Sequence, residues 1–113
     1  MKNKPLLKKY QQKTEDLVKI LKKIKPEKII LFGSLAQGKV HADSDIDICI
    51  IKKTKDRLKV KKRISDMMWR YNVGFDPEAD FHIYSPEVYY DWLRRGDPFI
   101  EEIEKGRVVY EAK

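Results

Sequence analysis

Three aspartates and a glycine–serine pair are the residues of this sequence best suited to chemistry. Asp45 and Asp47 are separated by one residue, Gly33 and Ser34 follow a short apolar run, and Asp80 lies further along the chain. Side chains two residues apart on a β-strand project from the same face, roughly 7 Å apart along the strand. Two carboxylates placed in this way repel each other, a cost that a bound cation normally offsets. Oxygen ligands of this kind favour Mg²⁺, which often shares its coordination shell with substrate phosphates.

The glycine–serine pair could hold those phosphates. Gly33 has no Cβ, so the backbone there can approach a ligand closely, and Ser34 adds a hydroxyl. Successive backbone N–H groups of residues 33–35 could form an anion-binding nest. A phosphate site beside paired carboxylates indicates metal-bridged phosphoryl chemistry, in which positioning and charge neutralisation do most of the catalysis.

Asp80 is the best candidate for a third carboxylate. If its strand lies beside the strand of Asp45 and Asp47 in the right register, all three acids share one face of the sheet. Together they could hold two metal ions about 3.5–4 Å apart, which would activate an attacking hydroxyl and hold a leaving pyrophosphate. Asp80 would then lie nearest the attacking group, as a metal ligand and as a proton acceptor.

Hydrophobic periodicity predicts the elements that position these residues. Residues 4–24 have helical periodicity, and Thr14, followed by two acids, predicts an N-cap that divides this region into two helices. Residues 28–32 and 46–50 are predicted strands on either side of the Gly-Ser loop. The later elements are a helix over 56–72, a strand over 79–84, helices ending at Gly96 and Gly106, and an edge strand over 107–111. We therefore expect a single domain over residues 1–113 with an α/β (α+β) fold, a small mixed sheet with helices covering one face.

Composition confines the positive charge to one segment. The chain of 113 residues has a formal net charge of +7, and residues 52–63 contain eight basic side chains and one acidic one. The rest of the chain is therefore formally neutral. A single cysteine, Cys49, excludes an internal disulfide framework and a cysteine-based zinc site, and it suits a reducing compartment. The charged first thirteen residues and the short apolar runs predict neither a signal peptide nor a membrane span, so we expect a cytoplasmic protein.

The run from residue 29 to residue 51, with Gly-Ser, a spacer and Asp-x-Asp, resembles the signature of the DNA polymerase beta-like nucleotidyltransferase superfamily. The whole chain, from its leading helix to the ending DPFIEEIEKGRVVYE, most resembles the minimal nucleotidyltransferases, small stand-alone prokaryotic members. The resemblance implies that Gly33 and Ser34 contact a nucleoside triphosphate such as ATP. It also implies that Asp45 and Asp47 bind two Mg²⁺ ions and that Asp80 binds the catalytic one.

The same resemblance implies a biological role. Many minimal nucleotidyltransferases are encoded beside a HEPN-domain protein, act as its antitoxin and transfer AMP from ATP to one of its tyrosines. One feature departs from the pattern, because many relatives carry basic residues just after Gly-Ser. Here Leu35, Ala36 and Gln37 occupy those positions, and Lys39 is the first positive charge. This loop therefore does not show how phosphate charge is balanced.

Several features allow more than one interpretation. His82 shares the strand parity of Asp80, although a histidine packed against the sheet is the simpler interpretation. Residues 52–63 can be a solvated helix face, a segment that steers a triphosphate or an acidic partner, or a nucleic-acid site. Three functions follow: an enzyme that transfers a nucleoside monophosphate to a protein hydroxyl, a catalytically inactive antitoxin that masks its partner, and a nucleic-acid-binding adaptor.

Overall fold

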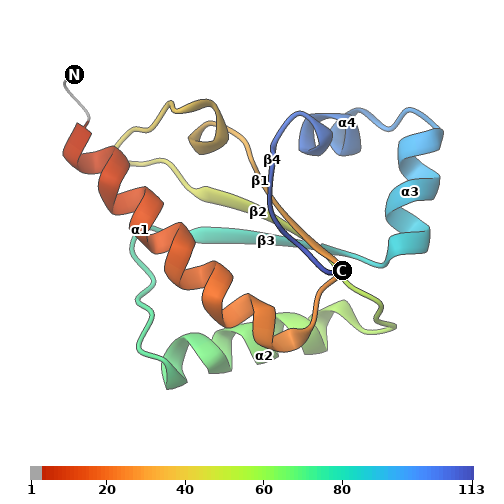
Figure 1. The fold of residues 1–113 in the computed structure, drawn as a ribbon, viewed down its shortest axis with the longest axis horizontal. Coiled ribbons are helices and arrows are strands. Elements are labelled where there is room, and N and C mark those ends of the chain that lie inside the picture. Colours follow the sequence, from red (N-terminus) through yellow and green to blue (C-terminus); the bar gives the residue numbers. More distant parts are fainter. Residues whose placement is uncertain (1–3) are drawn as a thin grey trace.

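Four strands form one mixed sheet in the computed structural model, which describes residues 4–113 (Figure 1). Their order across the sheet is β3-β2-β1-β4. β1 is antiparallel to β2 and β4, whereas β2 and β3 are parallel. The strands are β1 (Lys28–Phe32), β2 (Ile46–Ile51), β3 (Ala79–Tyr84) and β4 (Arg107–Glu111). The fold is therefore the predicted combination of α-helices with a small mixed sheet.

The helices lie on both faces of this sheet. In Figure 1, α1 crosses the sheet diagonally with α2 below it. α3 and α4 lie together at the right of the view, and they pack on the opposite face of the sheet. The helices are α1 (Lys4–Leu21), α2 (Arg57–Arg70), α3 (Pro86–Arg94) and α4 (Pro98–Glu104). Two short 3₁₀ turns are η1 (Lys22–Ile24) and η2 (Leu35–Gln37).

Alternation along the strands divides the core in two. Ile46, Ile48 and Ile50 of β2 pack with α1 and α2 on one face. Cys49 and Ile51, from the other parity of β2, pack with residues of α3 and α4 on the opposite face. The predicted covering of one face is confirmed for α1 and α2. α3 and α4 add a second, partial helical layer on the other face. They can do so because β1 and β2 have apolar side chains on both faces over most of their length.

The predicted division of the first helix at Thr14 is wrong. α1 is continuous from Lys4 to Leu21, and Thr14 is buried within it. The Thr14 hydroxyl donates a hydrogen bond to the carbonyl of Tyr10, at 2.8 Å. A threonine can satisfy its hydroxyl inside a helix through the carbonyl four residues earlier, so a capping residue type does not by itself begin a helix.

The other predicted helix starts carry side-chain caps. Asp56 accepts a hydrogen bond from the backbone N–H of Lys59 at the start of α2. Ser85 and Asp97 do the same for α3 and α4, each with proline at the first helical position. Within residues 4–113, no helix is both long and apolar enough to cross a membrane.

Candidate active site

The three candidate carboxylates come together at one end of the sheet. β2 and β3 pair in a register that puts Asp47 directly beside Asp80, and Asp45 immediately precedes β2. Asp47 has the strand parity of Cys49, which packs on the face covered by α3 and α4. The register that the sequence required for a shared acidic face is therefore present, and the acids lie where α3 and α4 leave that face open to solvent.

A histidine joins two of the aspartates. Ligand atoms of Asp47, Asp80 and His82 all lie within 4.8 Å of one another, close enough for one metal ion to bind all three. The His82 Nε2 atom is 3.2 Å from an Asp80 carboxylate oxygen. Asp45 is exposed and is not one of this triplet. The structure thus brings Asp80 to Asp47 as expected, and it puts His82 closer to them than the sequence indicated.

His82 is held by aromatic rings as well as by Asp80. Its ring centroid lies 5.3 Å from that of Phe32 and 5.2 Å from that of Phe99. The simpler interpretation, packing against the sheet, is thus present together with the contact to Asp80. Strand parity was the sequence signal for this position, but the packing partner on α4 could not be read from the sequence.

Gly33 makes room for Asp47. Its φ of +80° lies in the left-handed region, and a Cβ added there would overlap the Asp47 carboxylate. The close neighbour of this glycine is therefore a side chain of the acidic group. Ser34 follows and starts η2, where its carbonyl accepts hydrogen bonds from the backbone N–H groups of Gln37 and Lys39.

The missing basic residues after Gly-Ser have a packing explanation. Leu35 is buried in the core cluster beneath α1, and Ala36 packs against the same cluster. Lys39 is exposed. In this chain, the loop after Gly33 and Ser34 is thus fixed by apolar contacts to the body of the protein.

Burial and negative charge act together on Asp47. Burial raises the pKa of Asp47 above its ordinary value; His82 partly opposes this, and the neighbouring charges of Asp80 and Asp45 add to it. Such a carboxylate is costly to ionise on its own. A divalent cation bound between Asp47 and Asp80 would remove that cost, so the donor set of two carboxylates and one imidazole fits a metal ion.

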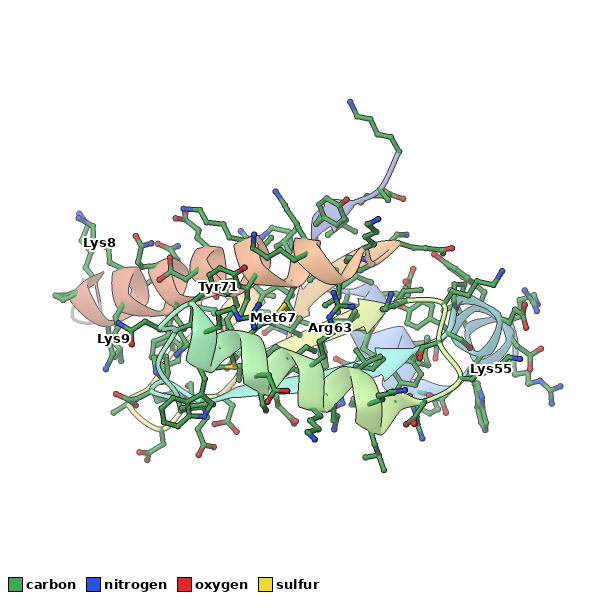
Figure 2. All side chains as sticks on the ribbon, turned by 90° about the horizontal axis from the view of Figure 1, so that it is seen from below. Lys8, Lys9, Lys55, Arg63, Met67 and Tyr71 are labelled. Atoms are coloured by element: carbon green, nitrogen blue, oxygen red, sulfur yellow. The ribbon has the colours of Figure 1, made fainter. Side chains whose placement is uncertain are left out.

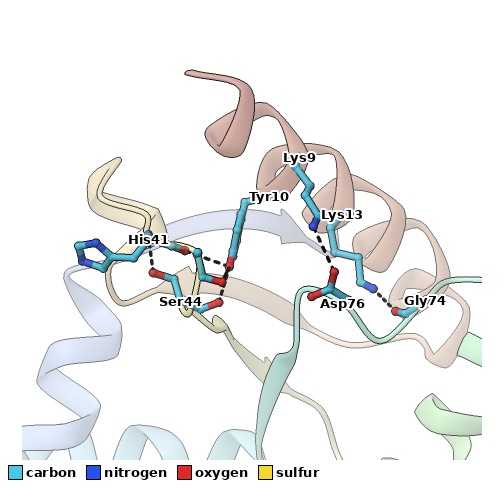
Figure 3. Close-up of polar contacts among 8 residues, drawn as sticks. Lys9, Tyr10, Lys13, His41, Ser44, Gly74 and Asp76 are labelled. Atoms are coloured by element: carbon cyan, nitrogen blue, oxygen red, sulfur yellow. Dashed lines mark hydrogen bonds and ion pairs between the residues drawn. The ribbon is translucent and has the colours of Figure 1, made fainter. Parts of the chain in front are cut away.

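α1 fixes the loop that leads into β2. The Tyr10 side chain is almost fully buried, and its hydroxyl donates to the carbonyl of Ser44, at 2.7 Å. The carbonyl of His41 is a further acceptor at 3.2 Å, and the His41 N–H donates to the Ser44 hydroxyl. Figure 3 shows these contacts gathered around the Tyr10 hydroxyl. Because Ser44 directly precedes Asp45, Tyr10 sets the entry into the strand of Asp45 and Asp47.

The same helix fixes the loop that leads into β3. Lys13 is buried and its ammonium group donates to the carbonyl of Gly74, and burial lowers the pKa of Lys13. One turn earlier, Lys9 forms an exposed ion pair with Asp76, at 3.1 Å (Figure 3). α1 therefore positions the approaches to both acidic strands from the far side of the sheet.

Comparison with known proteins agrees with this arrangement. The family model described as "Polymerase beta, Nucleotidyltransferase" matches residues 15–113, which include the Gly-Ser loop and all three aspartates. The chain belongs to this nucleotidyltransferase family. A relative from Methanocaldococcus jannaschii, named "Putative protein adenylyltransferase MJ0141", is 34% identical over 90 residues, covering 80% of this chain and 83% of the relative.

Family membership indicates which chemistry the acidic end of the sheet would have to support. Nucleotidyltransferases move a nucleoside monophosphate from a triphosphate to an acceptor, and the triphosphate carries several negative charges. In this nucleotidyltransferase, Asp47, Asp80 and His82 form a group able to hold a metal ion. Gly33 lies against the same group from β1. The candidate metal group and the predicted phosphate loop are therefore in contact through Gly33 and Asp47.

Proposed function

We propose that this nucleotidyltransferase transfers AMP from ATP to a hydroxyl group of a partner protein. The observation that carries the proposal is the pairing of Asp47 with Asp80 on adjacent parallel strands, against Gly33 at the end of β1. A phosphate loop and paired carboxylates in contact suit phosphoryl transfer better than any other common chemistry. The name of the Methanocaldococcus jannaschii relative supports a protein acceptor.

Mg²⁺ is the metal we propose, held by Asp47, Asp80 and Asp45, with His82 as a further donor or as a partner that orients Asp80. When bound, it would neutralise phosphate charge and polarise the reacting oxygens. Two ions are expected from the family resemblance.

The residues of the chain would share the transfer as follows. Gly33 and Ser34 lie beside the triphosphate and leave room for it. The acceptor oxygen forms a bond to the α-phosphorus while the bond from that phosphorus to pyrophosphate breaks. The hydroxyl proton passes to the Asp80 carboxylate, whose side chain is 58% exposed and so is accessible to an incoming acceptor. His82, at 3.2 Å, can share that proton.

The proposed acceptor is a tyrosine of a HEPN-domain toxin, which makes the chain an antitoxin. This part rests on the resemblance of residues 29–51 and of the chain ending to minimal nucleotidyltransferases.

The test is transfer of label from α-phosphate-labelled ATP, with Mg²⁺, to the HEPN-domain product of the neighbouring gene. We expect one labelled tyrosine with the wild-type chain and none with Asp45→Asn/Asp47→Asn. A matched control, Asp66→Asn/Glu101→Gln, removes two exposed carboxylates from α2 and α4 and should label like the wild type. Equal labelling by the wild type and the Asp45→Asn/Asp47→Asn variant would refute the proposal.

The same variants separate the enzyme from an antitoxin that acts by masking. If Asp45→Asn/Asp47→Asn still forms the complex and still suppresses toxicity, neutralisation does not need transfer. If the complex persists but suppression is lost, AMP transfer is the neutralising event. Complex formation is measured by size-exclusion chromatography and suppression by growth.

A further inference from the structure

We propose that the acceptor reaches the site as an extended, acidic polypeptide segment that docks along the outer edge of β3. This deepens the proposed function and depends on it for the identity of the segment as an acceptor. The docking surface, here called the β3 trough, is bounded by the basic start of α2 and by aromatic residues of β3, α3 and α4. Its members are Arg57, Leu58, Lys61, Tyr84, Trp92 and Phe99.

The sheet order fixes the side from which an acceptor must come. Gly33 follows β1, Asp47 lies on the central β2, and Asp80 lies on β3, the edge strand. In phosphoryl transfer, the attacking and leaving oxygens lie roughly in line on opposite sides of phosphorus. With pyrophosphate leaving beside Gly33 on the β1 side, the hydroxyl attacks from the opposite side. That side is the edge of β3.

β3 offers backbone hydrogen bonds along this edge. Among residues 4–113, β3 is paired on its β2 side alone. The carbonyls of Glu78 and Tyr84 accept hydrogen bonds from Ile46 and Lys52, so they point toward β2. Backbone groups alternate along a strand, so those of Phe81 and Ile83 point outward. An extended chain can add to such an edge as a further strand.

Two adjoining hollows follow the same edge. One, of about 350 Å³, lies between α2 and β3 and reaches His82 of the site. The other, of about 640 Å³, continues past Tyr84 to Trp92 and Phe99. Arg57 and Tyr84 line both. The Phe99 ring packs 5.2 Å from His82, so both hollows end beside the same site histidine.

The walls of the β3 trough expose apolar groups to solvent. Leu58 is 79% exposed, Trp92 49% and Phe99 42%. Each belongs to a helix that packs on the core through other side chains, so the helix does not need this exposed residue to hold it on the sheet. Apolar side chains gathered around an exposed strand edge fit the alternate side chains of an added strand.

The charge of the trough selects an acidic occupant. Lys55 and Arg57 line the larger hollow, and Lys61 lines the smaller one with Arg57. Asp97 is the acidic residue that lines the larger hollow. Its carboxylate accepts a hydrogen bond from the backbone N–H of Ile100 and so caps α4. Figure 2 shows Lys55 in the segment before α2, and Arg63 further along the helix on the side toward α1. Part of the basic segment therefore belongs to this trough and part lies away from it.

A polypeptide fits better than a nucleic acid, because the outward backbone groups of Phe81 and Ile83 match another backbone. A single-stranded nucleic acid would use the basic side chains and rings but not this edge. The basic segment and the strand edge are explained together by an acidic strand that presents its hydroxyl at Asp80.

The test uses a fluorescent heptapeptide with two acidic residues at each end and a tyrosine between two valines. Binding to the wild-type chain is followed by anisotropy without ATP, so it does not depend on catalysis. We expect Arg57→Glu/Lys61→Glu to weaken binding at least about tenfold, since two attractive pairs become repulsive. The matched control, Lys59→Glu/Arg63→Glu, makes the same charge change with the same spacing on the opposite side of α2 and should bind like the wild type.

Amide hydrogen exchange supplies the second measurement. The peptide should slow exchange at Phe81 and Ile83, while amides of β4, the other edge strand, stay unchanged. With labelled ATP and Mg²⁺, the peptide tyrosine should be labelled by the wild type. Binding and β3 protection without labelling would refute the trough as the route of the acceptor and leave it as a peptide site. Transfer itself is tested separately, with the HEPN-domain protein.

Three results would overturn the docking proposal. One is no binding of the peptide by the wild type up to 1 mM; another is equal weakening by both charge-reversal variants. The third is displacement of the peptide by a twelve-nucleotide uridine oligomer with steep salt dependence, which would make this surface a nucleic-acid site. Thermal unfolding of each variant checks that the exposed substitutions leave the fold intact.

Discussion

Replacing Gly33 with alanine tests whether the absence of a side chain at this position is needed for the placement of the Asp47 carboxylate. Two effects are expected. The first is backbone strain, since φ is +80° and a residue with a Cβ in the left-handed region costs about 1–2 kcal/mol. The second is steric, because the new Cβ overlaps the Asp47 carboxylate and must displace it.

Gly96 provides a matched control for the strain alone. Its φ is +78°, and a Cβ added there meets no atom within 4 Å. Gly96→Ala should therefore lower the free energy of unfolding by about 1 kcal/mol and the melting temperature by roughly 4 °C. Gly33→Ala carries the same strain plus the overlap, and moving one acid of the group should weaken divalent-ion binding about 10- to 100-fold.

The assay combines thermal unfolding with calorimetric titration of Mn²⁺, and then AMP transfer at saturating ATP. We expect Gly33→Ala to lose more metal affinity and more transfer than Gly96→Ala, whatever their relative stabilities. If both variants lose the same stability and retain the same metal affinity, Gly33 is needed only for its backbone conformation, and the steric reasoning is refuted.

Three other perturbations test single residues. In the presence of a chelator, Asp47→Asn should gain stability relative to the wild type as pH rises. The pKa of Asp47 is higher in the folded chain than its ordinary value of 3.8, so the protonated carboxyl favours folding at pH values below 3.8. The wild type loses this contribution as the pH rises through the pKa of the folded state. Chemical denaturation across pH measures the gain, and a constant difference between the two proteins would contradict it. Tyr10→Phe removes the hydroxyl that donates to the Ser44 carbonyl, so it should lower the free energy of unfolding by about 1 kcal/mol and slow AMP transfer. Unchanged transfer by a destabilised variant would mean that the loop before Asp45 does not need this hydrogen bond. Cys49 is fully buried, which raises its pKa to about 12, so iodoacetamide at pH 8.5 should modify it only in urea, and rapid labelling of the folded chain would be inconsistent with that burial.

Local patterns determined the elements and the identity of the acids. Alternation over residues 45–50 predicted a strand with an acidic start, and the prolines after Ser85 and Asp97 marked two helix starts. Such features depend on neighbours in the sequence, so they can be read from it. The prediction of a helix start at Thr14 was wrong because a threonine can use its hydroxyl either to cap a helix or to bond a carbonyl inside one. The residues around Thr14 decide between these two uses.

Long-range packing decided the composition of the candidate site. Strand parity allowed His82 to share a face with Asp80, but its closeness to both Asp47 and Asp80 needed the parallel pairing of β2 with β3. The tethers from Tyr10 and Lys13 to the two incoming loops join residues more than thirty positions apart. No local pattern contains such distances.

The charge of the chain shows the same division. The sequence by itself determined that the excess positive charge lies in residues 52–63, and it predicted three aspartates and a Gly-Ser pair as the candidate site residues. Only the tertiary structure decided which basic side chains lie beside the site, because the direction of each depends on how α2 packs against the sheet. Arg57 and Lys61 border the edge of β3, whereas Lys59 and Arg63 line a different hollow on the other side of the same helix.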